Sequence, residues 1–175
     1  AVARLDHPNV IQIHDLERIG EDWAIDMAYA EGGSLADAAA SGALTIQEAL
    51  SFVRDVLGAL AACHEVGVIH RDVKPNNILI SSDGRALLSD FGLAAILAEH
   101  HRTAVASASS SGLFVGTPRY APPESWNEQE PTPAWDVYSV GMVIFELVAG
   151  KTPYDAGSPF ALMRQMIEHP VPRLV

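Results

Sequence analysis

The stretch His70-Arg71-Asp72-Val73-Lys74-Pro75-Asn76-Asn77 decides the fold of this chain, together with the triplet Asp90-Phe91-Gly92 that follows it. In a fixed order, the two segments supply a carboxylate that can act as a base and two further oxygen donors of the kind that hold a hard metal ion. Transfer of a phosphoryl group needs positioning and neutralisation of charge more than covalent help. The pattern therefore indicates a phosphoryl-transfer site.

Both segments match the eukaryotic-type protein kinase family without a departure, since its catalytic loop is H-R-D-x-K-P-x-N and its metal-binding turn is D-F-G. A third segment, Gly116-Thr117-Pro118-Arg119-Tyr120-Ala121-Pro122-Pro123-Glu124, resembles the end of the family's activation segment, G-T-P-x-Y-x-A-P-E. It departs from that motif at Pro122, where alanine is usual, and we expect the stiffer loop to be tolerated. The chain thus resembles Hanks-type serine/threonine kinases, and its alanine- and arginine-rich composition with few lysines looks most like bacterial members.

The resemblance implies a role for each polar residue of these segments. Asp72 would orient the acceptor hydroxyl, and Lys74 would reach the transferred phosphate as a point charge typical of the serine/threonine branch. Asn77 and Asp90 would bind Mg²⁺ and, through it, the phosphates of ATP. Thr117 would hydrogen-bond toward Asp72 and Lys74. The implied catalytic set is therefore Asp72, Lys74, Asn77 and Thr117, and the implied substrate is a protein with a Ser or Thr acceptor.

The adenine end of an ATP site is implied elsewhere in the chain. Met27 falls at the family's gatekeeper position, and Ala28 to Ala30 would form the hinge, whose backbone groups read the adenine edge. Leu79 would be the floor under adenine, although an ordinary core leucine would look the same. The cofactors implied by the resemblance are ATP and Mg²⁺.

Two rival classes of protein stay open. One is a pseudokinase that acts as a binding module, in which Asp72, Lys74 and Asn77 would form only a polar network. The other is a small-molecule phosphotransferase with a kinase-like site, against which the peptide-docking segment at residues 116–124 argues. The sequence upstream of this chain would separate an active kinase from a pseudokinase.

The implied fold is α+β, with most of the chain in the helical large lobe of a kinase. Leu5-Asp6-His7-Pro8-Asn9-Val10 resembles the family's link from the small-lobe helix to the next strand. We therefore expect residues 1–27 to be a remnant of the small lobe and residues 28–175 to be the hinge and a truncated large lobe. The glycine-rich loop, the phosphate-binding lysine and its glutamate partner would lie upstream, and we expect the chain by itself to be inactive.

Local patterns predict several elements. Alternation at residues 10–14 and an apolar patch at 23–27 predict two strands around a turn at 20–22. A capping box at Thr45–Glu48 predicts the start of a long helix that ends near Gly67. We expect that helix to bury one face, made of Ile46, Ala49, Val53, Val56, Leu57 and Leu60. A hairpin is expected at residues 78–88 around Asp83-Gly84, and a helix at 159–168.

Two further expectations concern the catalytic loop. Asp136 opens a very apolar helix and, by resemblance, should hold the catalytic-loop backbone through its carboxylate, unless it is a simple helix cap. Arg71 precedes Asp72, a feature that in this family accompanies control by phosphorylation of the activation loop at residues 93–115. The candidate phosphate acceptors in that loop are Thr103, Ser107, Ser109, Ser110 and Ser111. An unmodified flexible linker would also contain such hydroxyl residues.

Composition agrees with an intracellular enzyme. The chain has 175 residues, is 49% hydrophobic and carries a formal net charge of −11, which argues against nucleic-acid and anionic-membrane partners. No segment is a secretory signal or a membrane span, so we expect a cytoplasmic location, with an anchor elsewhere in the parent protein left open. The single cysteine, Cys63, excludes a disulfide framework and is expected to be buried.

Overall fold

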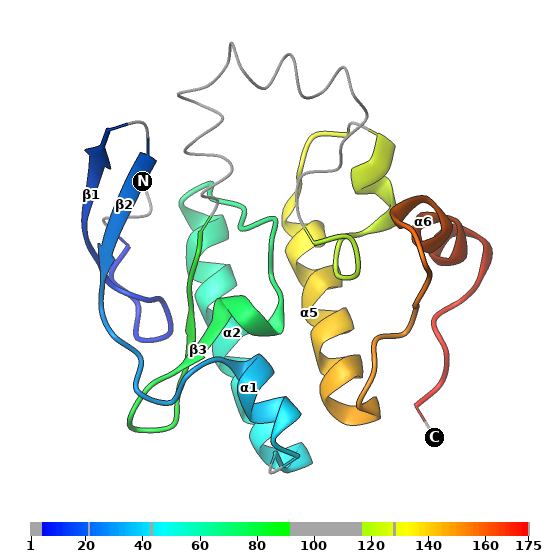
Figure 1. The fold of residues 1–175 in the computed structure, drawn as a ribbon, viewed down its shortest axis with the longest axis horizontal. Coiled ribbons are helices and arrows are strands. Elements are labelled where there is room, and N and C mark those ends of the chain that lie inside the picture. The colour runs from blue at the N-terminus through cyan, green and yellow to red at the C-terminus, as the bar shows by residue number, and fades with distance from the viewer. Residues whose placement is uncertain (1–4, 21, 43, 92–116, 128, 175) are drawn as a thin grey trace. The chain divides into compact units, whose positions relative to one another are not determined.

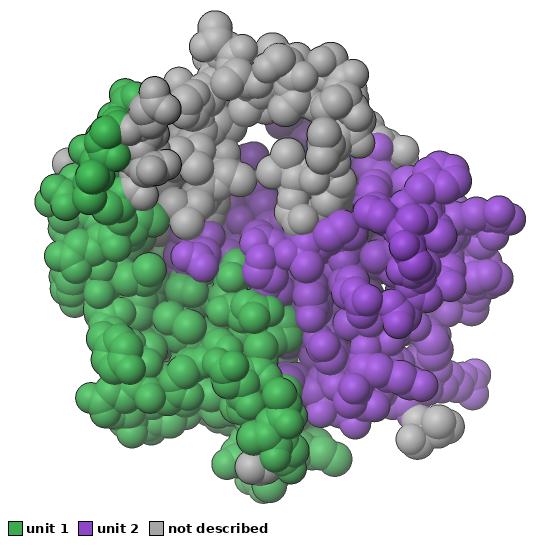
Figure 2. Space-filling model, in the orientation of Figure 1, with its two compact units in different colours: residues 1–68, 75–89 green, residues 69–74, 90–175 purple. Residues whose placement is uncertain are grey.

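The computed structural model describes residues 5–20, 22–42, 44–91, 117–127 and 129–174, which form small antiparallel sheets and longer helices (Figure 1). This mixture confirms the expected α+β class. The chain divides into two compact units (Figure 2). Unit 1 comprises residues 1–68 and 75–89, and unit 2 comprises residues 69–74 and 90–175.

Unit 1 begins with a two-stranded antiparallel ribbon of β1 (Ile13–Ile19) and β2 (Asp22–Met27). The strand expected at residues 10–14 is misplaced, because β1 begins only at Ile13 and runs to Ile19. Val10 instead forms an isolated parallel bridge with Leu88, and its side chain is buried. The apolar alternation that suggested a strand therefore belongs to a segment that pairs elsewhere, whereas most of β1 is exposed and polar and carries no such signal.

Two helices follow in unit 1, the short α1 (Leu35–Ala40) and the long α2 (Ile46–Glu65). The predicted capping box of α2 is confirmed: the Thr45 hydroxyl accepts from the Glu48 N–H at 3.2 Å, and the Glu48 carboxylate accepts from the Thr45 N–H at 2.9 Å. The helix ends just before Gly67, which has a φ of +76°. The predicted end of the helix is thereby confirmed.

The face that α2 buries differs in part from the prediction. Ile46 and Leu57 are exposed. The buried residues are Ala49, Phe52, Val56, Ala59, Leu60 and Cys63. The helical period was correct, but the apolar stripe that meets the core is rotated, because apolar residues occur on more than one side of this helix. The burial of Cys63 confirms its expected packing role.

The predicted hairpin is confirmed as β3 (Ile78–Ile80) and β4 (Ala86–Leu88), which pair antiparallel. Each strand has a further neighbour on its outer edge. On the β3 side, Ile80 exchanges two backbone hydrogen bonds with residues 32–33. On the β4 side, Leu88 exchanges two with residues 9–11. The result, which we call the β3–β4 layer, joins four short segments from distant parts of the chain.

Unit 2 is built around α5 (Pro133–Ala149) and α6 (Pro159–Glu168), and the latter has the predicted bounds. A short 3₁₀ helix, Pro123–Asn127, precedes α5. A core cluster joins α5, α6 and the loop between them: its buried members are Met142, Tyr154, Leu162 and Met166. Among the described residues, no helix has the length and apolar character that crossing a bilayer requires.

Candidate active site

Asp136 fixes the backbone at the start of the catalytic loop. Its carboxylate is fully buried one turn inside α5 and accepts from the His70 N–H at 2.9 Å and from the Arg71 N–H at 2.8 Å. The residue at the helix cap is Thr132, not Asp136. The prediction that Asp136 holds the catalytic-loop backbone is confirmed, and the alternative of a simple helix cap is wrong.

The backbone is strained at two positions within the motifs that decide the fold. Arg71 has a φ of +69° and Asp90 a φ of +57°, and they are the only non-glycine residues with positive φ in the described part of the chain. Non-glycine residues rarely adopt this left-handed region, and such strain tends to gather at functional sites. At Arg71, the bond from its N–H to Asp136 supports the strained conformation.

His70 organises the inside of the same loop. Its ring is buried, and Nδ1 accepts a hydrogen bond from the Asp72 N–H at 3.3 Å. Because Nδ1 accepts, the neutral ring carries its proton on Nε2. The ring also packs against Phe91, with centroids 4.8 Å apart and a tilt of 56°. Sequence reasoning assigned no role to His70 or Phe91, although both stand inside the quoted motifs.

The structure brings together three of the predicted catalytic residues. Lys74 Nζ donates to Asp72 Oδ2 at 2.7 Å and to Thr117 Oγ1 at 2.9 Å. The side chains of Lys74 and Asp72 are 21% and 32% exposed, so the pair lies at the surface of unit 2 with access for another molecule. A carboxylate and an ammonium group of the catalytic loop thus meet the hydroxyl of Thr117, which lies 43 residues beyond Lys74.

The two predicted metal ligands belong to different units. Asn77 ends a short 3₁₀ turn, is buried, and its main-chain oxygen accepts from the Ser89 N–H at 2.9 Å and from Ser89 Oγ at 3.0 Å. Asp90 directly follows Ser89 and is half-buried. One carboxylate and one amide oxygen fit Mg²⁺, which keeps several waters and takes few protein ligands beside substrate phosphates. The donor types are therefore suitable for this ion.

The residues predicted at the adenine end all lie in unit 1. Met27 is the last residue of β2, and the Ala28 N–H donates to the main-chain oxygen of Gln12 at 2.8 Å, which ties the predicted hinge to the residue that precedes β1. Ala30 is buried. Leu79 is half-buried in the middle of β3, where it also forms a bridge with Ser34 just beyond the hinge.

The segment after Thr117 is fastened to α5. Tyr120 Oη donates to Glu146 Oε2 at 2.7 Å, and Ser139 Oγ donates to the Tyr120 main-chain oxygen at 2.9 Å. Burial, followed by the hydrogen bond to Glu146, raises the pKa of the Tyr120 hydroxyl well above its usual range. Tyr120 therefore keeps its proton and remains a donor, which holds residues 117–120 on the helix. Neither Tyr120 nor Glu146 was assigned this role from the sequence.

Comparison with known proteins defines the class. A family model described as the protein kinase domain matches residues 1–172. The chain therefore belongs to the protein kinase family, as the motifs indicated.

Bacterial serine/threonine-protein kinases are among its curated relatives. The chain is 38% identical to serine/threonine-protein kinase PknL of Mycobacterium tuberculosis, over 99% of this chain and 42% of that protein. It is 36% identical to serine/threonine-protein kinase PkaB of Streptomyces coelicolor, over 98% of this chain and 42% of that protein. It is 33% identical to serine/threonine-protein kinase PrkC of Bacillus subtilis, over 98% of this chain and 26% of that protein. The chain thus spans less than half the length of these relatives, and its resemblance to the bacterial Hanks-type kind is confirmed.

Some predictions fall on residues that the structure does not describe. They are the glycine of the Asp-Phe-Gly turn, the start of the Gly116 to Glu124 segment, and the activation loop with its five candidate phosphorylation sites. Regulation through Arg71 therefore stays a prediction.

Proposed function

We propose that the protein containing this chain transfers the γ-phosphate of ATP to Ser and Thr hydroxyls of proteins. The observation that carries the proposal is the position of Lys74, within hydrogen-bond distance of both Asp72 and Thr117. A carboxylate that can take a hydroxyl proton stands here beside a cation that can face a transferred phosphoryl group, and these are the two functions the reaction needs.

In the proposed reaction, a bond forms between the acceptor oxygen and the γ-phosphorus while the bond from that phosphorus to the β-phosphate oxygen breaks. Asp72 orients the acceptor hydroxyl and takes its proton. Lys74 holds Asp72 Oδ2 in place and offsets the charge on the phosphoryl oxygens. Thr117 accepts a second hydrogen bond from Lys74 and ties the site to the segment that we propose docks the protein substrate.

Asn77 and Asp90 are the proposed ligands of Mg²⁺, an ion that neutralises phosphate charge when it is bound. The bonds from Ser89 to the Asn77 main-chain oxygen fix the backbone of one ligand beside the residue that precedes the other. The strained φ of Asp90 is consistent with a functional demand on that residue.

The base of ATP is proposed to lie against Met27, the backbone of Ala28 to Ala30, and Leu79. These residues share unit 1, and β3 carries Leu79 next to the segment that follows the hinge. We also propose that residues 1–27 belong to the small lobe and that residues 28–175 form the hinge and part of the large lobe.

We also propose a class of partner and a cellular location for this segment. A net charge of −11 supports a protein substrate over nucleic acid or an anionic membrane as the partner of this segment. Dependence on ATP and a single buried cysteine support a cytoplasmic location.

The proposed function is tested with the full-length protein, radiolabelled ATP and a generic basic protein as acceptor. Label should appear on Ser or Thr, and Asp72→Asn should lower turnover by about 10² or more because the hydroxyl loses its base. ATP affinity should stay near that of the parent. A parent that binds ATP but labels no protein would contradict transfer and favour a binding module. An Asp72→Asn variant at the full rate would reject the role of Asp72.

A further inference from the structure

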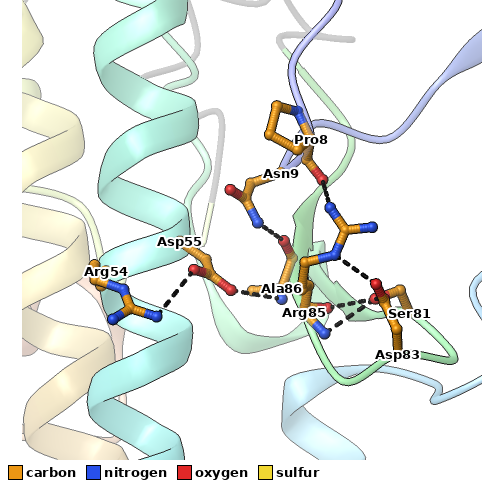
Figure 3. Close-up of polar contacts among 8 residues, drawn as sticks. All are labelled: Pro8, Asn9, Arg54, Asp55, Ser81, Asp83, Arg85 and Ala86. Atoms are coloured by element: carbon orange, nitrogen blue, oxygen red, sulfur yellow. Dashed lines mark hydrogen bonds and ion pairs between the residues drawn. The ribbon is translucent and has the colours of Figure 1, made fainter.

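Ala86 in β4 is buried, yet both its backbone groups bond to side chains and not to another strand. Its N–H donates to Asp55 Oδ2 at 3.2 Å, and its main-chain oxygen accepts from Asn9 Nδ2 at 2.9 Å, as Figure 3 shows. Asp55 comes from α2, and Asn9 from the segment before β1. The side chains of Asn9 and Asp55 therefore supply the hydrogen bonds that a neighbouring strand would otherwise supply to Ala86 at this edge.

The geometry of the β3–β4 layer explains why Ala86 needs them. Its register partner across the hairpin is Ile80. The Ile80 N–H donates to the Gly33 oxygen and the Ile80 oxygen accepts from the Gly32 N–H, each at 2.9 Å, so both its backbone groups point away from β4. Ile80 and Ala86 are therefore a non-hydrogen-bonded pair of the antiparallel hairpin, and the N–H and C=O of Ala86 also point away from the opposite strand. Without Asn9 and Asp55, Ala86 would bury an N–H and a C=O without partners.

The opposite edge of the layer lies directly against the segment that follows the proposed hinge. A Cβ atom placed on Gly32 would lie 2.7 Å from the Ile80 oxygen and 2.8 Å from its Cβ, so this contact has no spare room. A displacement of β3 must therefore move Gly32 and the backbone next to it. A continuous set of contacts connects the pair of side chains at Ala86 with the residues at 28–30.

We propose that Asn9 and Asp55 are positioning residues for the adenine end of the ATP site. They hold Ala86, which fixes β4 and thereby sets the position of β3, with Leu79, against the hinge. The inference rests on the proposed use of ATP. It assigns a function in nucleotide binding to two residues that contact no nucleotide themselves.

Two exposed arginines lie next to the pair. Arg85 bonds to Asp83 at 2.7 Å and to the Pro8 main-chain oxygen at 3.2 Å, which closes the hairpin turn (Figure 3). Arg54 lies 3.8 Å from Asp55 Oδ1 but is 79% exposed, whereas Asp55 is 15% exposed. Removing Arg54 therefore leaves both bonds to Ala86 in place, and Arg54→Ala is a matched control.

One substitution at each member of the pair removes its bond to Ala86. Asn9→Asp replaces the donor to the Ala86 oxygen by an acceptor, so the bond is lost and two oxygens face each other. Asp55→Leu removes the acceptor of the Ala86 N–H and keeps a side chain of similar size. If Asn9→Asp does not fold, Gly32→Ala perturbs the far side of the same layer at Ile80.

The variants are compared in the full-length protein by calorimetric titration with ATP and by steady-state phosphorylation of a basic protein. Asn9→Asp, or Gly32→Ala in its place, should raise the Kd and KM for ATP about 3- to 10-fold, the value of one net hydrogen bond, with kcat at saturating ATP within about twofold of the parent. Asp55→Leu should raise the Kd and KM for ATP in the same way, because the Ala86 N–H loses its acceptor. Arg54→Ala should match the parent in all three constants.

Unchanged Kd and KM in a folded Asn9→Asp or Gly32→Ala protein would overturn the positioning role. So would a fall in the apparent kcat with an unchanged KM, because a merely structural role predicts a loss of active protein and not a weaker affinity for ATP. A parent protein that neither binds ATP nor transfers phosphate would instead overturn the proposed function and this inference with it. The three results are therefore distinguishable.

Discussion

At the scale of single residues, one carboxylate has a large effect on the candidate site. The left-handed conformation of Arg71 costs a non-glycine residue about 1–2 kcal/mol. Asp136 offsets that cost with two hydrogen bonds, from the N–H groups of His70 and Arg71. The position of Asp72, the next residue, follows from this support and from its own N–H bond to His70.

Replacing Asp136 tests this support. Asp136→Ala leaves two N–H groups without their charged acceptor, so the free energy of unfolding should fall by about 3 kcal/mol. Denaturation by urea measures the change, with Asp155→Ala as control, since Asp155 is exposed and pairs with the exposed Arg119. Equal stability of the Asp136→Ala protein and its parent would show that the loop is held by other contacts.

Tyr138 gives a prediction about pH. Burial, with smaller effects from Tyr154 and Glu124, raises its pKa to about 12. Because the unfolded hydroxyl titrates near pH 10, the folded state holds this proton more tightly, and the associated stability is complete below pH 10. It should be lost as pH rises from 10 to 12. Urea denaturation at pH 9 to 12 should show a smaller decline for Tyr138→Phe, and an equal decline would contradict the assignment.

At the scale of elements, the correct predictions concern structural features that are set by residues adjacent in the sequence. The capping box at Thr45, the turn at Gly84 and the helix at 159–168 are local and were correct. The first strand was misplaced because the partner of Val10 is Leu88, far along the chain. Helical spacing also could not tell which face of α2 meets the core.

The residues of the candidate site also fall into two groups, those that a local motif marks and those that no local pattern marks. The motifs named Asp72, Lys74 and Thr117, and the structure brings their side chains together. No local pattern marks Asn9 or Asp55, because their partner is the backbone of Ala86 and backbone groups leave no trace in a sequence.

Two threonines that precede helices provide a prediction at this scale. Thr45 caps α2 through its side chain, whereas Thr132, which precedes α5, makes no such bond. Thr45→Ala should therefore lower the free energy of unfolding by about 1 kcal/mol. Thr132→Ala should leave it nearly unchanged. Thermal unfolding of both variants measures the difference, and equal shifts would refute the importance of the capping box.

At the scale of the whole molecule, the two units separate the residues proposed at the adenine end from most of those proposed for catalysis. The former lie in unit 1, and Asp72, Lys74 and Thr117 lie in unit 2, whereas Asn77 lies in unit 1. The boundary passes between Lys74 and Pro75, inside the motif that decides the fold. The continuous sequence of the motif gives no sign of this boundary. Contacts with residues far away in the sequence assign the two parts of the motif to different units.

The central claim is that the contact of Lys74 with Asp72 and Thr117 forms a phosphoryl-transfer site. It is tested most directly by the kcat of full-length Lys74→Ala, with Lys151→Ala as control, since these are the two lysines of the chain and Lys151 is exposed. Lys74→Ala should lower kcat by about 10² because a charge at the transferred phosphoryl group is lost, with ATP affinity nearly unchanged. Lys151→Ala should match the parent. Equal kcat values for the two variants would contradict the account.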